Sequence, residues 1–187
     1  MLTRKRQIEI ENVVVELLED YGITNYPISI QTLARKLGIE LLPYSQIEES
    51  ALRVARLASE DAFSTSSVNY FFTTIAFEDR GSYFYRTRFS GAHEIGHIVL
   101  EHKDGNNRIA EEEADYFAGY LLAPHPLILA ANNKHHVADR FGVSGSCASF
   151  ACDQAILRSR EGQLWRPHEK WLLDNITWEG GGLAGQA

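Results

Sequence analysis

The sequence predicts an α+β protein in which a small mixed sheet packs on one central helix, with a small helical region towards the C-terminus. Three observations lead to this class. Apolar residues recur at helical spacing in several segments, two segments have the aromatic and β-branched composition of strands, and glycine or proline separates these segments. With 187 residues, 44% of them hydrophobic, the chain is long enough to bury a core.

Two short helices open the chain. The first is predicted by an apolar stripe that stops at Gly22 and consists of Val13, Val14, Leu17, Leu18 and Tyr21. A turn at residues 25–27 follows, after which Ser29 can cap a second helix that ends at Gly38.

Two strands and two longer helices come next. Pro124 and Pro126 stop the second of these helices, and a short polar loop joins it to the first. Because the loop is short, we expect the two helices to be neighbours. The predicted strands are residues 39–44 and 68–77, and the predicted helices are residues 86–102 and 109–123.

The last third of the chain contains a helix-turn-helix-like region. Residues 137–141 and 148–157 are predicted to be helices on either side of a tight turn. We therefore place one domain at residues 1–160, which includes this helix-turn-helix-like region at 137–157. A C-terminal extension at residues 161–187 ends in a Gly-rich tail that is expected to be disordered.

Composition argues against several classes of function. The chain has 18 Lys and Arg against 25 Asp and Glu, and its net charge of -7 argues against extensive non-specific binding to the phosphates of nucleic acids. No stretch approaches the roughly 18 apolar residues of a membrane span, and the N-terminus lacks the apolar core of a signal peptide. Cys147 and Cys152 are too close together for a disulfide framework. These features predict a soluble, cytoplasmic protein with reduced thiols.

The segment His93-Glu94-Ile95-Gly96-His97 carries the strongest chemical signal. On a helix, His93 and His97 lie about one turn apart, with roughly 6 Å of rise, so both imidazoles face one point. Zinc accepts two such nitrogens, and catalytic zinc sites use three protein ligands and leave a fourth position to water. Glu94 lies about 100° around the helix, where its carboxylate can act as general base towards that water. The pattern therefore predicts one zinc ion per chain.

The following helix offers the third ligand. Glu111 and Asp115 are four residues apart and share one face. We assign Glu111 to the metal and Asp115 to an outer position, where it accepts the N–H of a histidine ligand; the exchanged assignment is the alternative. Glu112 and Glu113 project away from the Glu111 face and are expected to be solvated. An adjoining apolar stripe would dock this helix on the preceding one, and consists of Ala114, Phe117, Ala118 and Leu121.

Two glycines in the first of these helices also need a reason. Gly91 and Gly96 are each unfavourable in a helix by about 1 kcal/mol relative to Ala, which points to close packing or to the approach of a substrate. The other histidines lack the spacing of metal ligands, and among them only His102 is retained as a further candidate for the site.

Several of these segments resemble the ImmA/IrrE family of metallopeptidases. The resemblance rests on residues 88–89, 92–97, 111–118 and 121–124, and it extends over roughly residues 8–160. It implies a zincin-like fold, zinc bound by His93, His97 and a glutamate of the following helix, and Glu94 as the catalytic residue. Members of this family commonly act in regulatory circuits of mobile elements or stress responses, where they cut a helix-turn-helix repressor.

The resemblance thus predicts a zinc endopeptidase that acts on a helix-turn-helix transcriptional repressor. One alternative is a regulator that binds a repressor or another protein without cutting it. DNA binding through residues 137–157 is a weaker alternative, because residues 146–157 contain no Lys or Arg that could contact bases or phosphates.

Overall fold

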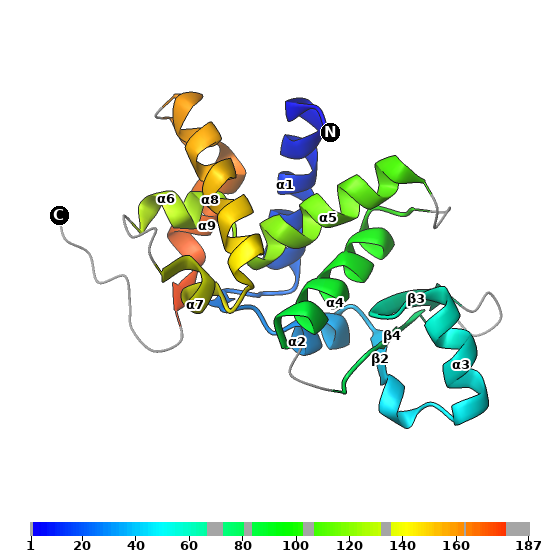
Figure 1. Ribbon diagram of the computed structural model, residues 1–187. Coiled ribbons are helices and arrows are strands. Elements are labelled where there is room, and N and C mark those ends of the chain that lie inside the picture. Colours follow the sequence, from blue (N-terminus) through cyan, green and yellow to red (C-terminus); the bar gives the residue numbers. More distant parts are fainter. Residues whose placement is uncertain are drawn as a thin grey trace. The chain divides into compact units, whose positions relative to one another are not determined.

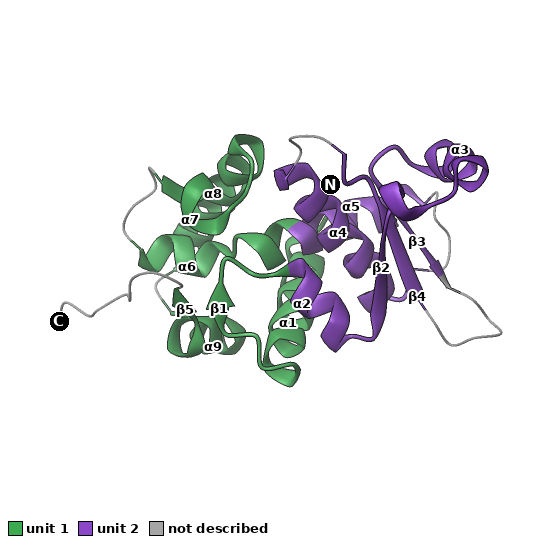
Figure 2. Cartoon of the chain, turned by 90° about the horizontal axis from the view of Figure 1, so that it is seen from below, with its two compact units in different colours: residues 1–29, 119–187 green, residues 30–118 purple. Residues whose placement is uncertain are grey.

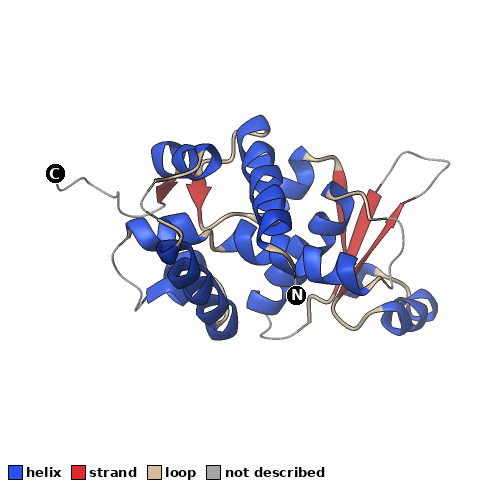
Figure 3. Ribbon diagram, turned by 90° about the horizontal axis from the view of Figure 1, so that it is seen from above, coloured by secondary structure: helices blue, strands red, loops and turns tan. Residues whose placement is uncertain are grey.

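The structure, a computed structural model, describes residues 2–66, 73–80, 84–102, 107–131, 136–162 and 164–178 (Figure 1). Helices make up most of the described chain and the strands form small sheets, which confirms the α+β class (Figure 3). None of the described helices combines the length and the apolar character needed to cross a membrane. In chain order the elements are α1 (Arg4–Asp20), β1 (Asn25–Tyr26), α2 (Ile30–Lys36), β2 (Ile39–Pro43), a 3-10 turn (Tyr44–Gln46), α3 (Glu49–Ala58), β3 (Ala62–Ser66), β4 (Thr73–Phe77), α4 (Phe84–Val99), α5 (Arg108–Leu122), α6 (His125–Ala130), α7 (Val137–Phe141), α8 (Gly145–Arg160), α9 (Pro167–Asn175) and β5 (Thr177–Trp178).

The chain divides into two compact units, one of residues 30–118 and one of residues 1–29 with 119–187 (Figure 2). In the first unit the sheet has the strand order β2-β4-β3. β2 runs parallel to β4, and β3 runs antiparallel to β4. Helix α4 contacts β3 and β4, so the mixed sheet packs on this helix as the sequence predicted.

Sequence patterns predicted neither α3 nor β3. Helix α3 buries Leu52 and Ala55 but leaves Val54 and Leu57 67% and 87% exposed, so only some of its apolar residues face the core. Of the strand predicted at residues 68–77, the structure shows β4, while residues 68–72 lie outside the described residues. The small core beneath α3 consists of Tyr44, Leu52, Ala55 and Ala76.

In the unit of residues 1–29 and 119–187, α1 packs on α9, and α6 packs on α8 and α9. The turn predicted at residues 25–27 is wrong in part, because Asn25 and Tyr26 form a strand that pairs in parallel with β5. Tyr26 is fully buried, its hydroxyl donates to the Leu121 carbonyl at 2.8 Å, and its ring contacts Trp178. The strand therefore forms around a buried aromatic residue rather than from a periodic pattern.

The helix-turn-helix-like region appears as α7 and α8. Gly142 has a φ of 60° and ends α7 in the left-handed conformation that favours glycine. The Ser144 hydroxyl accepts the Cys147 N–H at 3.2 Å and caps α8, which therefore begins three residues earlier than predicted. At its other end, α8 continues to Arg160 because Arg158 is buried in an ion pair with Glu169.

Candidate metal centre

Helix α4 carries both histidines of the HExxH segment on one face. The Nε2 atoms of His93 and His97 lie 2.9 Å apart, and both side chains are largely shielded from solvent, with 17% and 13% exposed. The helix was predicted to run from residue 86 to residue 102, but it begins at Phe84 and ends at Val99. His102 therefore lies beyond α4 and is not on its helical face.

The close approach of α5 to α4 explains one of the glycines. A Cβ at Gly96 would lie 3.0 Å from Phe117 Cδ1 and 3.3 Å from the Cα of Ala114. Gly91 is similarly restricted by Ile30 on α2, whose Cγ2 would be 3.0 Å away. Close packing is thus the reason for a bare backbone at both positions. It brings the first turn of α5, with Glu111, next to the histidine pair.

Glu111 completes a set of three ligand atoms. Its Oε2 lies 3.3 Å from His93 Nε2, and its Oε1 lies 3.4 Å from His97 Nε2. A tetrahedral zinc ion with ligand distances of about 2.0–2.1 Å keeps its ligand atoms about 3.3 Å apart. The two Nε2 atoms lie 2.9 Å apart, and each lies 3.3 or 3.4 Å from a different oxygen of the Glu111 carboxylate, which is close to that spacing. These residues therefore fit a zinc ion in both geometry and chemistry, and they form one of the groups able to hold a metal among the described residues.

Asp115 lies behind His93, on the side away from Glu111. Its Oδ1 is 2.9 Å from His93 Nδ1. Because an ionised carboxylate can only accept, Nδ1 of His93 carries the proton, and Nε2 is the ring atom that faces His97 and Glu111. Burial lowers the pKa of His93, but the hydrogen bond and charge of Asp115, with the charges of Glu94 and Glu111, raise it overall.

A second chain of contacts lies behind His97. Nδ1 of His97 is 3.0 Å from Nδ1 of His102, and Nε2 of His102 is 3.1 Å from Oε2 of Glu113. The prediction that Glu113 is solvated is wrong, because this residue is only 8% exposed. Burial, followed by the nearby charge of His93, lowers the pKa of His97, so its ring is neutral at neutral pH.

Glu94 points from α4 towards β3, where it meets a residue that sequence reasoning missed. The Ser64 hydroxyl and the Ser64 backbone N–H both donate hydrogen bonds to the Glu94 carboxylate. Burial raises the pKa of Glu94, and these hydrogen bonds and His93 only partly offset it, so the pKa stays above its ordinary value. No motif marks Ser64, because it reaches the site through the pairing of β3 in the sheet.

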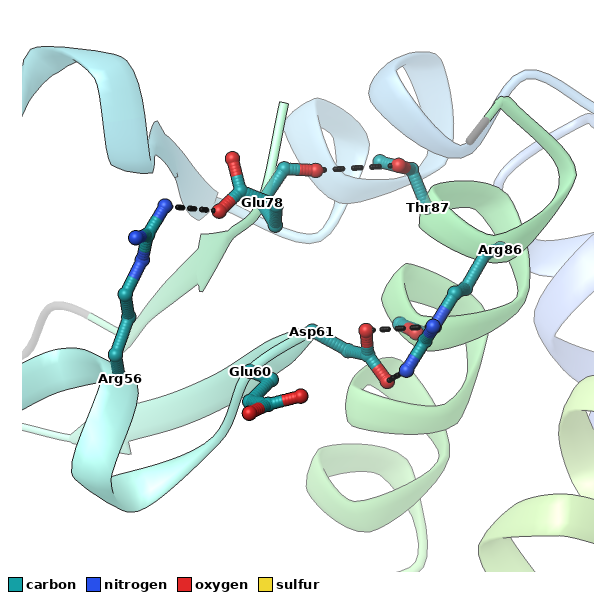
Figure 4. Close-up of a pocket in the computed structure, with 7 residues that line it drawn as sticks. Arg56, Glu60, Asp61, Glu78, Arg86 and Thr87 are labelled. Atoms are coloured by element: carbon teal, nitrogen blue, oxygen red, sulfur yellow. Dashed lines mark hydrogen bonds and ion pairs between the residues drawn. The ribbon is translucent and has the colours of Figure 1, made fainter. Parts of the chain in front are cut away.

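A cavity of about 330 Å³ lies beside the first half of α4 (Figure 4). Arg86 pairs with Asp61 at 2.7 Å, and Arg56 pairs with Glu78 at 2.6 Å. Ser90 also lines the cavity and precedes Glu94 by four residues, so both occupy one face of α4. The cavity thus lies along the same helix face as the glutamate of the HExxH segment.

A second group of potential ligands, Glu11, His125 and Glu169, is buried in the other unit. Arg4 already binds Glu11 at 2.6 Å, and Arg158 binds Glu169 at 2.6 Å. Guanidinium groups therefore already supply the positive charge that a metal would bring, and they would repel it. This group is a buried ion-pair network that joins α1, α6, α8 and α9, and it is a poor candidate for a metal.

Residues 74–152 match the model of one protein family, the IrrE N-terminal-like domain, also called Peptidase_M78. The matched segment is shorter than the span suggested by the resemblance, but it contains α4, the first turn of α5 and all three candidate ligands. No curated protein matches the chain.

Proposed function

Because residues 74–152 match the model of the Peptidase_M78 family of metallopeptidases, we propose that this chain is a zinc-dependent endopeptidase with a zincin-like site. The observation that carries the proposal is the convergence of His93 Nε2, His97 Nε2 and the Glu111 carboxylate. Two imidazole nitrogens and a carboxylate that meet at one point form a set of donors suited to a cation. In this proposal, the three residues hold one zinc ion per chain.

Bound at such a site, zinc acts as a Lewis acid that lowers the pKa of water towards about 7 and polarises a peptide carbonyl. Glu94 supplies the base. Its raised pKa makes the carboxylate a stronger proton acceptor than a solvated glutamate, and Ser64 holds it in one orientation. Glu94 takes the proton from the attacking water on a carboxylate oxygen and passes it to the nitrogen of the departing amine.

Asp115 acts on the reaction through His93. By accepting the Nδ1 proton at 2.9 Å, it fixes the tautomer in which Nε2 is a ligand. The charge of the carboxylate also makes the imidazole a better electron donor. The exchanged assignment, with Asp115 on the metal and Glu111 outside, is less favourable, because Asp115 contacts the outer nitrogen of His93 and Glu111 contacts the inner one.

The substrate we infer is a helix-turn-helix transcriptional repressor. The resemblance supports this class of substrate, and the net charge of -7 would favour encounter with a basic DNA-binding protein. The cavity of Figure 4 offers a place for a substrate side chain on the face of α4 that carries Glu94. Its lining contains three carboxylates and two guanidinium groups, which suits a polar or charged side chain rather than an apolar one.

The proposal is tested by metal content and cleavage together. The purified protein should contain about one zinc per chain and should cut at least one member of a panel of purified helix-turn-helix repressors. Glu94→Gln should keep the zinc and lose cleavage, whereas His93→Ala with His97→Ala should lose both. Absence of zinc from the wild-type protein after zinc is supplied would refute the metal site. Zinc binding and repressor binding that both persist without cleavage would instead favour the non-proteolytic regulator.

A further inference from the structure

We propose that His102 and Glu113 form a relay that positions His97 as a metal ligand. The inference rests on the proposed function, since it concerns the ion that His97 would hold. Neither residue touches the point where the three ligand atoms converge. Each acts through its neighbour, Glu113 on His102 and His102 on His97.

The end of α4 brings His102 into place. The His102 N–H donates to the His97 carbonyl at 3.0 Å, and the Glu101 N–H donates to the Ile98 carbonyl at 3.2 Å. With Glu101 at a φ of 56°, this is a Schellman motif whose left-handed position is occupied by glutamate instead of glycine. The motif turns the chain back on the last turn of the helix. The backbone bond between His102 and His97 accompanies the contact between their rings, whose centroids are 5.0 Å apart.

The hydrogen-bond roles in the relay follow from its last member. Glu113 as a carboxylate can only accept, so His102 Nε2 carries a proton and donates it at 3.1 Å. In a neutral ring, Nδ1 of His102 is then an acceptor, and it takes its hydrogen bond from Nδ1 of His97 at 3.0 Å. His97 is left with a bare Nε2, which is the atom that faces His93 and Glu111. Glu113 thereby sets the tautomer of His97 without contacting it, through His102.

Burial makes this arrangement difficult to explain as an incidental surface contact. The side chains of His102 and Glu113 are each only 11% exposed. A buried carboxylate and a buried imidazole are costly unless both are hydrogen-bonded, and here each satisfies the other. Each ligand histidine therefore has its own carboxylate: Asp115 serves His93 directly, and Glu113 serves His97 through His102.

The test measures metal binding, which does not require a known substrate. Zinc affinity is obtained by competition with a chelating dye, and the visible absorption of the Co²⁺-loaded protein reports the ligand geometry. Loss of an outer partner of a metal ligand typically weakens metal binding by about 10–100-fold. We expect His102→Phe, which keeps the ring and removes the acceptor, to lose affinity in that range and to change the Co²⁺ spectrum.

Two variants separate positioning from packing. His102→Asn places a carboxamide oxygen near the position of Nδ1, so it should recover most of the affinity that His102→Phe loses. Glu113→Gln should weaken zinc binding, because a carboxamide can also donate to His102 and permits the wrong tautomer. Glu112→Gln removes the same charge from the neighbouring position of α5 and should bind zinc as the wild type does. Thermal unfolding of each metal-free variant verifies that it is folded.

The outcomes distinguish the relay from the site itself. If wild-type protein binds zinc and Glu111→Gln does not, the metal site stands. Wild-type affinity and an unchanged Co²⁺ spectrum in both His102→Phe and Glu113→Gln would then overturn the relay alone. If the wild-type protein itself fails to bind zinc, the proposed function fails, and the relay fails with it.

Discussion

A single methyl group added at Gly96 tests the contact that brings α5 to the histidine pair. The added Cβ would lie 3.0 Å from Phe117 Cδ1 and 3.3 Å from Ala114 Cα. Both neighbours are 0% exposed and one of the two atoms is backbone, so neither can move aside easily. Overpacking costs about 1–3 kcal/mol, against a gain of about 1 kcal/mol from replacing a helical glycine by alanine. We therefore expect Gly96→Ala to lower the free energy of unfolding by up to about 2 kcal/mol.

Gly119→Ala is the matched control. A Cβ at Gly119 on α5 would meet its nearest neighbour, Phe150, at 3.7 Å, which is an ordinary contact. This variant should therefore gain up to about 1 kcal/mol of stability from helix propensity alone. Urea unfolding of the metal-free proteins, followed by circular dichroism, measures both changes. If Gly96→Ala were as stable as the wild type or more stable, close helix packing would not be the reason for this glycine.

Three further expectations concern acid, the end of α4 and the metal. Burial lowers the pKa of His125 to about 4 from 6.5, and Arg4 and Arg158 oppose the carboxylates of Glu11 and Glu169 around it. As the pH falls, the unfolded chain therefore takes up this proton before the folded chain does, and the free energy of unfolding should fall by about 3 kcal/mol between pH 6.5 and pH 4. Urea unfolding at pH 7 and at pH 4.5 measures this loss, which should be smaller in His125→Phe than in the wild type. An equal loss in both proteins would show that His125 is not its source. Glu101→Gly replaces a glutamate in the left-handed conformation and should raise the free energy of unfolding by up to about 1 kcal/mol without loss of zinc affinity. Thermal unfolding measures the stability and dye competition measures the affinity; a less stable variant would contradict the expectation. Excess zinc at about 1,000 times its Kd should stabilise the wild-type protein by about 4 kcal/mol, with no such gain in His93→Ala, and an equal gain in both proteins would place the zinc elsewhere.

The central pair of helices could be predicted from the sequence because its signals are local. The spacing of His93 and His97 depends only on helix geometry, and the prolines at the end of α5 mark its boundary to within one residue. Gly96 added information that periodicity does not contain, since an unfavourable residue inside a helix predicts that something packs closely against it. Elements that depend on distant partners were less visible: β1 exists because β5, 152 residues later in the chain, pairs with it.

Glu113 shows in physical terms why part of the site escaped prediction. It lies about 200° around α5 from Glu111, so helix geometry predicts that the two carboxylates face different surroundings, which is correct. The error was to assume that Glu113 faces solvent. It faces His102, which reaches this side of α5 because the chain leaves α4 through a residue in the left-handed conformation, Glu101. Since that conformation is usually taken by glycine or asparagine, a glutamate at position 101 gives no warning of the turn. Periodicity predicts the contacts made by regular elements, whereas this relay depends on the first residues beyond one.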